Sequence, residues 1–239
     1  MVIWWNQGEG NSLQIACLVQ CRKGFTARLL RYRDQLPLTI IDGPYGVSHD
    51  FGSFGTIIMF ATGIGIAGHL PYLKELVHGY NNRVVRTRYI ILVWQLDKEC
   101  HQEWVSEWMD EVLQADTDRI LKISLYVLGD YLVPRYFAEV VSHGYHNRIR
   151  TIYAPAKVGE ILKDEITNRK GKTLVSTCTD EVINDIIKNC VTSEMDSNLR
   201  LVQLDFHPPT RPRPLSSELD YWCQGEMSEK AIELRSSRP

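Results

Sequence analysis

Three glycines spaced as Gly63-x-Gly65-x-x-Gly68 are the residues of this sequence best suited to binding a phosphate group. They follow a strand-like run of apolar residues, 56–61, and precede an apolar helical pattern over 70–77. A glycine-rich turn in this context lets the backbone approach a diphosphate, and the N–H groups of the helix start carry the positive end of its dipole. We therefore expect a nucleotide diphosphate to bind here; the alternative is a glycine-rich turn without a ligand.

Strand-like and helix-like segments alternate around this loop. The expected strands are 56–61, 87–94, 121–128, 148–153, 173–176 and 201–204, and the expected helices are 70–77, 103–113, 158–166 and 181–187. This alternation predicts an α/β fold with a doubly wound, mainly parallel sheet and helices on both faces. Ahead of it, the sequence predicts strands over 12–20 and 38–41, with a short helix over 24–30 between them.

Composition excludes some classes of protein. The chain has 239 residues, of which 44% are hydrophobic and 23% charged, as in ordinary globular domains. A net charge of −2 argues against a nucleic-acid-binding protein that relies on neutralising phosphates. We therefore expect small-molecule nucleotides and no nucleic acid as partners. No apolar stretch reaches the roughly 20 residues of a membrane helix, and the first residues lack a signal-peptide pattern. The chain alone is expected to be soluble and cytoplasmic.

The six cysteines are scattered through the sequence. A chain of this length does not need a disulfide framework, so reduced thiols are expected. Cys17 and Cys21 are four residues apart, but no histidine stands at ligand spacing to complete a metal site.

Three motifs occur in a characteristic order. They are Asp42-Gly43-Pro44-Tyr45-Gly46, the glycine loop continuing into His69-Leu70-Pro71-Tyr72-Leu73, and Val175-Ser176-Thr177-Cys178. In these motifs, and over about residues 4–206, the sequence resembles the C-terminal half of fungal ferric reductase-like transmembrane proteins. That family belongs to the ferredoxin-NADP reductase superfamily and is related to NADPH oxidases.

The resemblance implies three regions. Residues 1–46 would be a remnant of a β-barrel that binds FAD, 47–206 the NAD(P)-binding domain, and 207–239 a flexible, proline-rich and polar tail. In relatives a His-Pro-Phe run precedes a tryptophan-containing strand, and this sequence begins just past the place of that run, with Trp4 and Trp5. We therefore expect the FAD site to be incomplete.

The resemblance also assigns cofactor-binding residues to the first region. Gly24, Phe25 and Thr26 match the helix start that holds the flavin diphosphate, the alternative being a simple capped helix. The run Gly43, Pro44, Tyr45 and Gly46 is assigned to cofactor binding as well.

In the second region, Thr62, Gly63, Gly65 and Ile66 are expected at the diphosphate of NADP or NAD.

The adenine ribose is expected at the end of strand 87–94, at Gln95 and Asp97. A carboxylate there would bond a ribose 2′-OH, whereas the adjacent Lys98 would attract a 2′-phosphate. Because the family mostly uses NADPH, the resemblance favours NADPH over NADH. The alternative for both residues is a solvated charge pair at a strand end.

Cys178, with Thr177 before it, stands where the family has a cysteine that faces nicotinamide C4. The implied role is to position the nicotinamide for hydride transfer to flavin N5, without covalent catalysis. Thr179-Asp180 follows the cysteine in place of the usual glycine.

The implied activity is that of an NAD(P)H-dependent ferric or cupric chelate reductase. In a full-length relative, hydride passes to FAD and electrons then pass through haem in a membrane domain to an extracellular metal chelate. The NAD(P)-binding portion would lie at the cytosolic face of that membrane. Two alternatives stay open: a superoxide-generating NADPH oxidase-type domain, and a truncated, non-catalytic nucleotide-binding remnant.

Overall fold

The computed structural model of the chain describes residues 2–7, 13–32, 35, 38, 40, 46–129, 140–167, 171–194 and 197–205. These residues divide into two units: those up to Ser48 together with Asp205, and His49–Leu204. The expected tail residues and the run Gly43, Pro44 and Tyr45 lie outside the described residues.

The smaller unit contains an antiparallel pair of strands, β1 (Val2–Gln7) and β2 (Leu13–Cys17). They are followed by a short helix, α1 (Phe25–Leu29), and a 3-10 turn, η2 (Leu30–Tyr32). The strand and helix expected over 12–20 and 24–30 are thus present, although each is shorter than its sequence pattern.

The strand expected over 38–41 is not seen at the positions of that segment that the structure describes. Leu38 and Ile40, the two described positions of the segment 38–41, have no regular secondary structure and are 99% and 91% exposed. An isolated apolar run forms a strand only where a neighbouring strand and a packed face receive it.

The larger unit is built on a seven-stranded sheet. Its strands are β3 (Thr56–Thr62), β4 (Tyr89–Leu96), β5 (Leu121–Val127), β6 (Val140–His143), β7 (Ile149–Ile152), β8 (Thr173–Cys178) and β9 (Leu199–Gln203). Their order in the sheet is β6-β7-β5-β4-β3-β8-β9, and every pair is parallel except β6 with β7. The predicted doubly wound, mainly parallel sheet is confirmed, and β6 is an antiparallel edge strand that the sequence pattern did not indicate.

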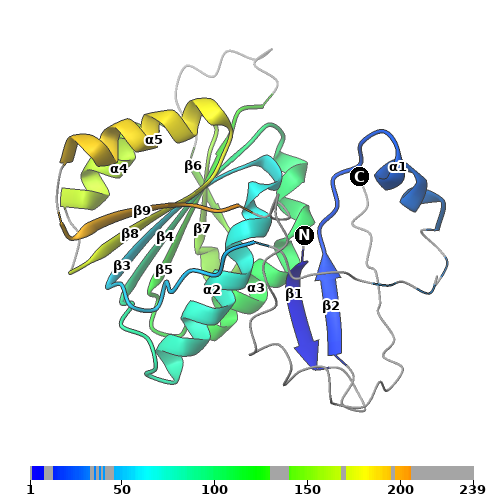
Figure 1. The fold of residues 1–239 in the computed structure, drawn as a ribbon, viewed down its shortest axis with the longest axis horizontal. Coiled ribbons are helices and arrows are strands. Elements are labelled where there is room, and N and C mark those ends of the chain that lie inside the picture. Colours follow the sequence, from blue (N-terminus) through cyan, green and yellow to red (C-terminus); the bar gives the residue numbers. More distant parts are fainter. Residues whose placement is uncertain are drawn as a thin grey trace, which may run out of the picture. The chain divides into compact units, whose positions relative to one another are not determined.

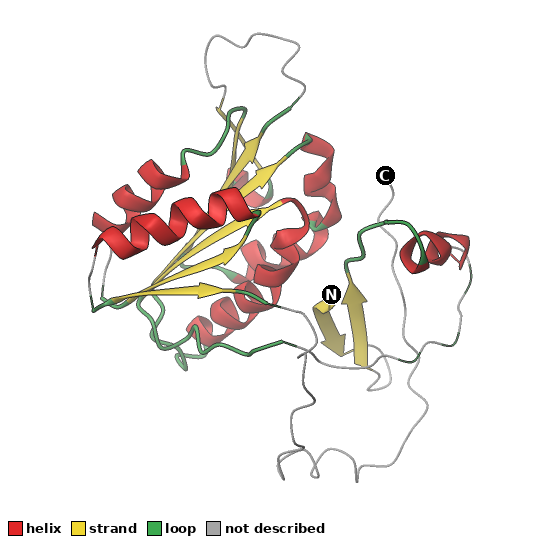
Figure 2. Cartoon of the chain, turned by 45° about the horizontal axis from the view of Figure 1, so that its top comes forward, coloured by secondary structure: helices red, strands yellow, loops and turns green. Residues whose placement is uncertain are grey.

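Helices cover both faces of this sheet. In both views α2 (Ile66–Asn81) and α3 (Ser106–Ala115) lie on one face, and α4 (Val158–Thr167) and α5 (Glu181–Glu194) on the other (Figure 1, Figure 2). The interior strand β3 is therefore buried over nearly its whole length, as expected for a parallel sheet covered on both sides. Ile58 and Phe60 pack into the core under α4 and α5, so the alternate residues Ile57 and Met59 face the α2 side.

The helix predicted over 103–113 begins later than expected. A 3-10 segment, η4 (Glu99–Trp104), comes first, and α3 starts at Ser106. The ring of Trp104 stacks on His101 with centroids 4.2 Å apart, while the residues that α3 buries are Met109, Val112 and Leu113.

Among the residues described, none of the helices combines the length and the apolar composition that crossing a bilayer requires.

A buried ion pair holds the turn between α3 and β5. The Asp116 carboxylate accepts the backbone N–H groups of Ile120 and Leu121, each at 3.0 Å, and is paired with the Arg148 guanidinium. Arg148 also donates to the carbonyls of Leu113 and Asp116, both at 2.9 Å. The side chain of Asp116 is 1% exposed and that of Arg148 is 10% exposed. Each buried charge is therefore stabilised by the other and by these hydrogen bonds.

We expect Arg148→Ala to lower the free energy of unfolding by about 3–5 kcal/mol, because it leaves the buried Asp116 carboxylate without a charge partner. Chemical denaturation followed by circular dichroism measures this loss. Lys157→Ala is the matched control: it breaks an exposed pair with Glu160 and should cost at most about 1 kcal/mol. Equal effects of the two substitutions would contradict the prediction.

Candidate nucleotide-binding site

The order of the strands reverses between β3 and β8. From β3 the chain builds β4, β5 and β7 on one side, and it then returns to place β8 and β9 on the other. In sheets of this kind ligands bind at the carboxyl ends of the strands, at such a reversal. The glycine loop after β3 and the turn 179–180 after β8 flank this point.

The loop glycines are required for two different reasons. Gly63 and Gly65 bound a 3-10 turn, η3 (Gly63–Gly65), between β3 and α2. Gly63 has φ +47°, a left-handed conformation that favours glycine. Gly65 is helical, but a Cβ there would lie 1.9 Å from the carbonyl oxygen of Cys178. No side chain fits at position 65 without a shift of the backbone.

Two hydrogen bonds from other elements hold the loop. The indole Nε1 of Trp94, a fully buried residue of β4, donates to the carbonyl of Gly63 at 2.8 Å. The hydroxyl of Thr62 accepts the backbone N–H of Asp180 at 2.8 Å, which ties the end of β3 to the turn after β8. The loop is thus fixed from both neighbouring strands.

The start of α2 has no side chain that would compete with an anion. It has no side-chain cap and no acidic residue in its first turn. The first N–H groups of a helix have no partners within the helix, and its dipole favours a negative charge there. Ile66, also expected at the site, buries its side chain completely, and its N–H donates to the Ile64 carbonyl.

Cys178 and Thr177 point in opposite directions at the end of β8. Cys178 lies opposite Ala61 in the register and against Gly65. The hydroxyl of Thr177 donates to Asn184 of α5 at 3.0 Å, on the other face of the sheet. The structure therefore brings Cys178 to the glycine loop and leaves the side chain of Thr177 away from it.

The thiol of Cys178 is kept in its protonated form. Burial raises the pKa of Cys178 to about 11, because the thiolate is poorly solvated there. A thiol with this pKa is a poor nucleophile at neutral pH. This agrees with a role in packing against a ligand and not with covalent chemistry.

At the end of β4, the expected ribose site is bridged to the segment after β7. The side-chain carbonyl of Gln95 accepts the N–H of Ala156 at 3.0 Å, and Glu99 accepts the hydroxyl of Tyr153 at 2.8 Å. Asp97, by contrast, is exposed, and its carboxylate makes no hydrogen bond or ion pair within the described part of the chain.

In the smaller unit, the expected flavin residues lie at the start of α1. Gly24 has φ +90°, with nothing within 4 Å of where a Cβ would lie. The Thr26 hydroxyl accepts the N–H of Arg22 at 2.8 Å and donates to its carbonyl at 3.1 Å, and Phe25 is 67% exposed. Gly46 has φ +109°, which suits the glycine that ends its motif.

Two buried side chains at the site were missed by sequence reasoning: Trp94 and His69. His69, on α2, is fully buried, and its Nε2 lies 3.2 Å from the hydroxyl of Ser176 on β8. Burial lowers the pKa of His69 to about 4, partly offset by the backbone of Gly65 and Ser176, so the ring is neutral at physiological pH. A histidine in helical register with Leu73 and Leu76 was the available signal.

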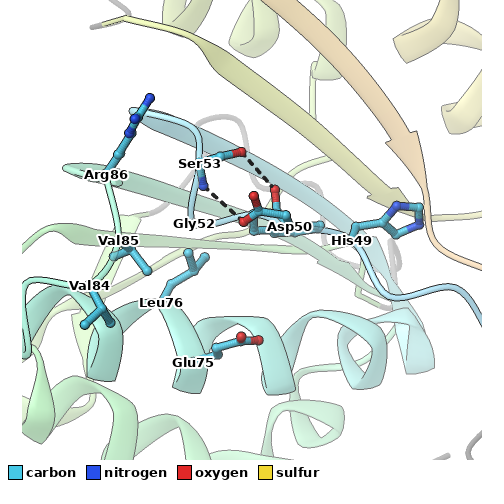
Figure 3. A pocket seen from close by; sticks show the side chains of 10 residues that line it. His49, Asp50, Gly52, Ser53, Glu75, Leu76, Val84, Val85 and Arg86 are labelled. Atoms are coloured by element: carbon cyan, nitrogen blue, oxygen red, sulfur yellow. Dashed lines mark hydrogen bonds between the residues drawn. The ribbon is translucent and has the colours of Figure 1, made fainter. Parts of the chain in front are cut away.

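A separate hollow of about 560 Å³ opens at the amino ends of the strands. Figure 3 shows Asp50 and Ser53 at its wall, with the Asp50 carboxylate accepting the N–H of Ser53 at 3.2 Å, and Glu75 rising from α2. Arg86, just before β4, also lines it. The glycine loop follows the carboxyl end of β3 and Cys178 is the last residue of β8, so this hollow lies at the opposite end of the strands from the expected nucleotide site. No group of His, Cys, Asp or Glu suited to a metal ion occurs among the described residues.

Comparison with known families decides the class of the chain. The model of the ferric reductase NAD binding domain matches residues 54–192. The chain belongs to the ferric reductase NAD-binding domain family. The match begins two residues before β3 and ends within α5, so it includes the glycine loop and Cys178. The family resemblance expected from the three motifs is confirmed.

Relatives of this ferric reductase NAD-binding domain include metal reductases and oxidases. The Ferric/cupric reductase transmembrane component 7 of Saccharomyces cerevisiae (strain YJM789) is 29% identical over 131 residues, which are 50% of this chain and 20% of the relative. Respiratory burst oxidase homolog protein B of Arabidopsis thaliana is 22% identical over 111 residues, 41% of this chain and 13% of that protein. Human Dual oxidase 2 is 23% identical over 129 residues, 48% of this chain and 8% of the oxidase. The matched part of the chain thus spans a fifth or less of each of these proteins.

Among solved structures, the CS-b5R domains of human Ncb5or in the NAD+ form align with a TM-score of 0.46 and 17% identity. The alignment covers 77% of this chain and 46% of that structure.

We expect alkylation of Cys178 by iodoacetamide to accelerate about tenfold per pH unit from pH 7 to 10, because a pKa of about 11 keeps the thiolate fraction small throughout. Peptide-level mass spectrometry separates this thiol from the exposed Cys21 and Cys100. A cysteine-containing model peptide, with an ordinary pKa of ~8.5, is the reference, and its alkylation rate should level off above about pH 9. A rate for Cys178 that levels off with the peptide would contradict the expectation.

Proposed function

We propose that this domain binds NAD(P)H for a flavin-dependent reductase whose final acceptors are ferric or cupric chelates. The observation that carries the proposal is the uncapped start of α2 at the strand-order reversal, with Gly65 packed against the carbonyl of Cys178. The nicotinamide nucleotide would supply a hydride, and FAD would accept it.

The residues of this chain would bind and orient the nucleotide. Backbone N–H groups at the start of α2 would hold the diphosphate, with the Trp94–Gly63 and Asp180–Thr62 hydrogen bonds keeping the loop in place. The protonated thiol of Cys178 would pack against the nicotinamide end. Since the loop is already fixed, little conformational freedom would be lost when the ligand binds.

For FAD, the described residues of the smaller unit fit in part. The turn at Gly24 is open, but the hydroxyl of Thr26 is already bound to the backbone of Arg22. FAD enters the proposal through the family, and no step is assigned to these residues.

The proposed acceptor follows the relatives. The yeast ferric/cupric reductase is 29% identical over 50% of this chain, and the plant and human oxidases are 22% and 23% identical over 41% and 48% of it. This difference favours a metal chelate over oxygen. A membrane domain that carries haem is the proposed partner, and NADPH and NADH are both proposed as donors.

We expect calorimetric titration of the purified chain to show saturable binding of NADPH or NADH. Gly65→Ala should abolish it, because the added methyl group would lie 1.9 Å from the Cys178 carbonyl oxygen at the edge of the site. Gly159→Ala is the matched control: its Cβ would make only ordinary contacts, the nearest to Cys190 Sγ at 3.5 Å, on the far face of the sheet. Absence of binding by the unaltered chain would overturn the proposed function and favour a non-catalytic remnant; FAD is titrated in parallel.

The two charges after β4 should rank the two nucleotides. We expect Asp97→Asn to weaken NADH binding and strengthen NADPH binding, because the carboxylate bonds a 2′-OH and repels a 2′-phosphate. Lys98→Gln should weaken NADPH by about three- to tenfold and leave NADH unchanged. The ratio of the two dissociation constants is the measurement, and an unchanged ratio in both variants would place the ribose elsewhere.

A further inference from the structure

His69 connects α2 and β8, the helix and the strand that carry the two sides of the candidate site. It lies four residues after Gly65, one turn into α2, and its ring reaches the hydroxyl of Ser176 across 3.2 Å. Ser176 precedes Cys178 by two residues on β8, so their side chains face the same side of the sheet. One imidazole thus spans from the helix that carries the glycine loop to the strand that carries the cysteine.

The polar partners of this ring are few and specific. Both His69 and Ser176 are fully buried. His69 Nδ1 makes no hydrogen bond of standard geometry with the described residues. The backbones of Gly65 and Ser176 are the other polar neighbours of the ring. A buried polar ring costs free energy unless its hydrogen bonds are made, so an apolar residue of similar size would suit a purely structural position better.

The spacing between α2 and β8, which the His69 ring spans, matters because Gly65 and the Cys178 carbonyl are in close contact. Gly65 is packed so closely against the Cys178 carbonyl that even one methyl group would not fit. A small separation of α2 from β8 would therefore change the spacing between the diphosphate loop and the cysteine directly. The loop is also held by the hydrogen bond from Trp94 on β4 and by the one from Asp180 in the turn after β8.

We propose that His69 is a positioning residue that sets the spacing between the glycine loop and Cys178, and hence between the diphosphate and nicotinamide ends of the ligand. This inference rests on the proposed function. It requires that a ligand spanning both ends depend on His69 more strongly than a ligand that contacts the loop alone.

The test compares matched ligands and variants of the whole chain. NADH is paired with ADP-ribose, and NADPH with 2′-phospho-ADP-ribose, because each fragment keeps the diphosphate and lacks the nicotinamide. The variants are His69→Leu, which fills the space without a hydrogen bond, and His69→Gln, which restores a polar group. His78→Leu is the control, since His78 is exposed on the same helix.

We expect His69→Leu to weaken the dinucleotide about tenfold, the effect of one lost buried hydrogen bond, and the fragment less than about twofold. His69→Gln should recover most of the loss, and His78→Leu should change nothing. Equal weakening of dinucleotide and fragment, or no weakening of either, would overturn the proposal. If His69→Leu does not fold, Ser176→Ala removes the same hydrogen bond with a smaller change and is judged by the same comparison.

A second measurement separates failure of this inference from failure of the proposed function. If the unaltered chain binds no dinucleotide, the proposed function fails, and alkylation of Cys178 still tests the spacing. In His69→Leu, loosening of α2 from β8 should expose the Cys178 thiol and raise its alkylation rate at pH 8 about tenfold. In His78→Leu the alkylation rate should not change. An unchanged rate would overturn the positioning role.

Discussion

The contact between Gly65 and the carbonyl oxygen of Cys178 is the constraint on which the rest of the site depends. It joins the loop after β3 to the end of β8, two strands that are neighbours in the sheet but far apart in the sequence. A contact this close tolerates neither a side chain nor a change in strand register. The glycine pattern is therefore explained by the strand pairing as much as by any ligand.

Each element around this contact meets two demands at once. Strand β3 is buried on both faces, which makes it a rigid support, and its last residue, Thr62, also ties the loop to Asp180. Trp94 fills the core with a large apolar ring and uses its single N–H to hold Gly63. Packing and positioning are thus performed by the same side chains, so core substitutions here would change the geometry of the site.

The sequence predicted the parts of this fold that depend on local patterns. Alternation of strands and helices, and the glycine turn between β3 and α2, follow from periodicity and turn chemistry, which are local properties. The edge strand β6 and the lack of a strand at Leu38 and Ile40 depend on whether a neighbouring strand is available for pairing. The opposite orientations of Thr177 and Cys178 follow from strand alternation, whereas the Trp94–Gly63 hydrogen bond joins residues 31 positions apart and leaves no local signal.

The charges of the site are divided between its interior and its rim. In the interior, His69 is neutral, Cys178 is protonated, and the start of α2 carries no acidic residue. A diphosphate at the start of α2 would therefore meet backbone donors and no acidic side chain in the first turn of that helix. This part of the ligand is the same in NADH and NADPH. Asp97 and Lys98, both exposed just after β4, are the charges proposed above to distinguish the two nucleotides. Because solvent screens charges at the rim, exchange of these residues would change the preference for a nucleotide without disturbing the part of the site that holds the diphosphate.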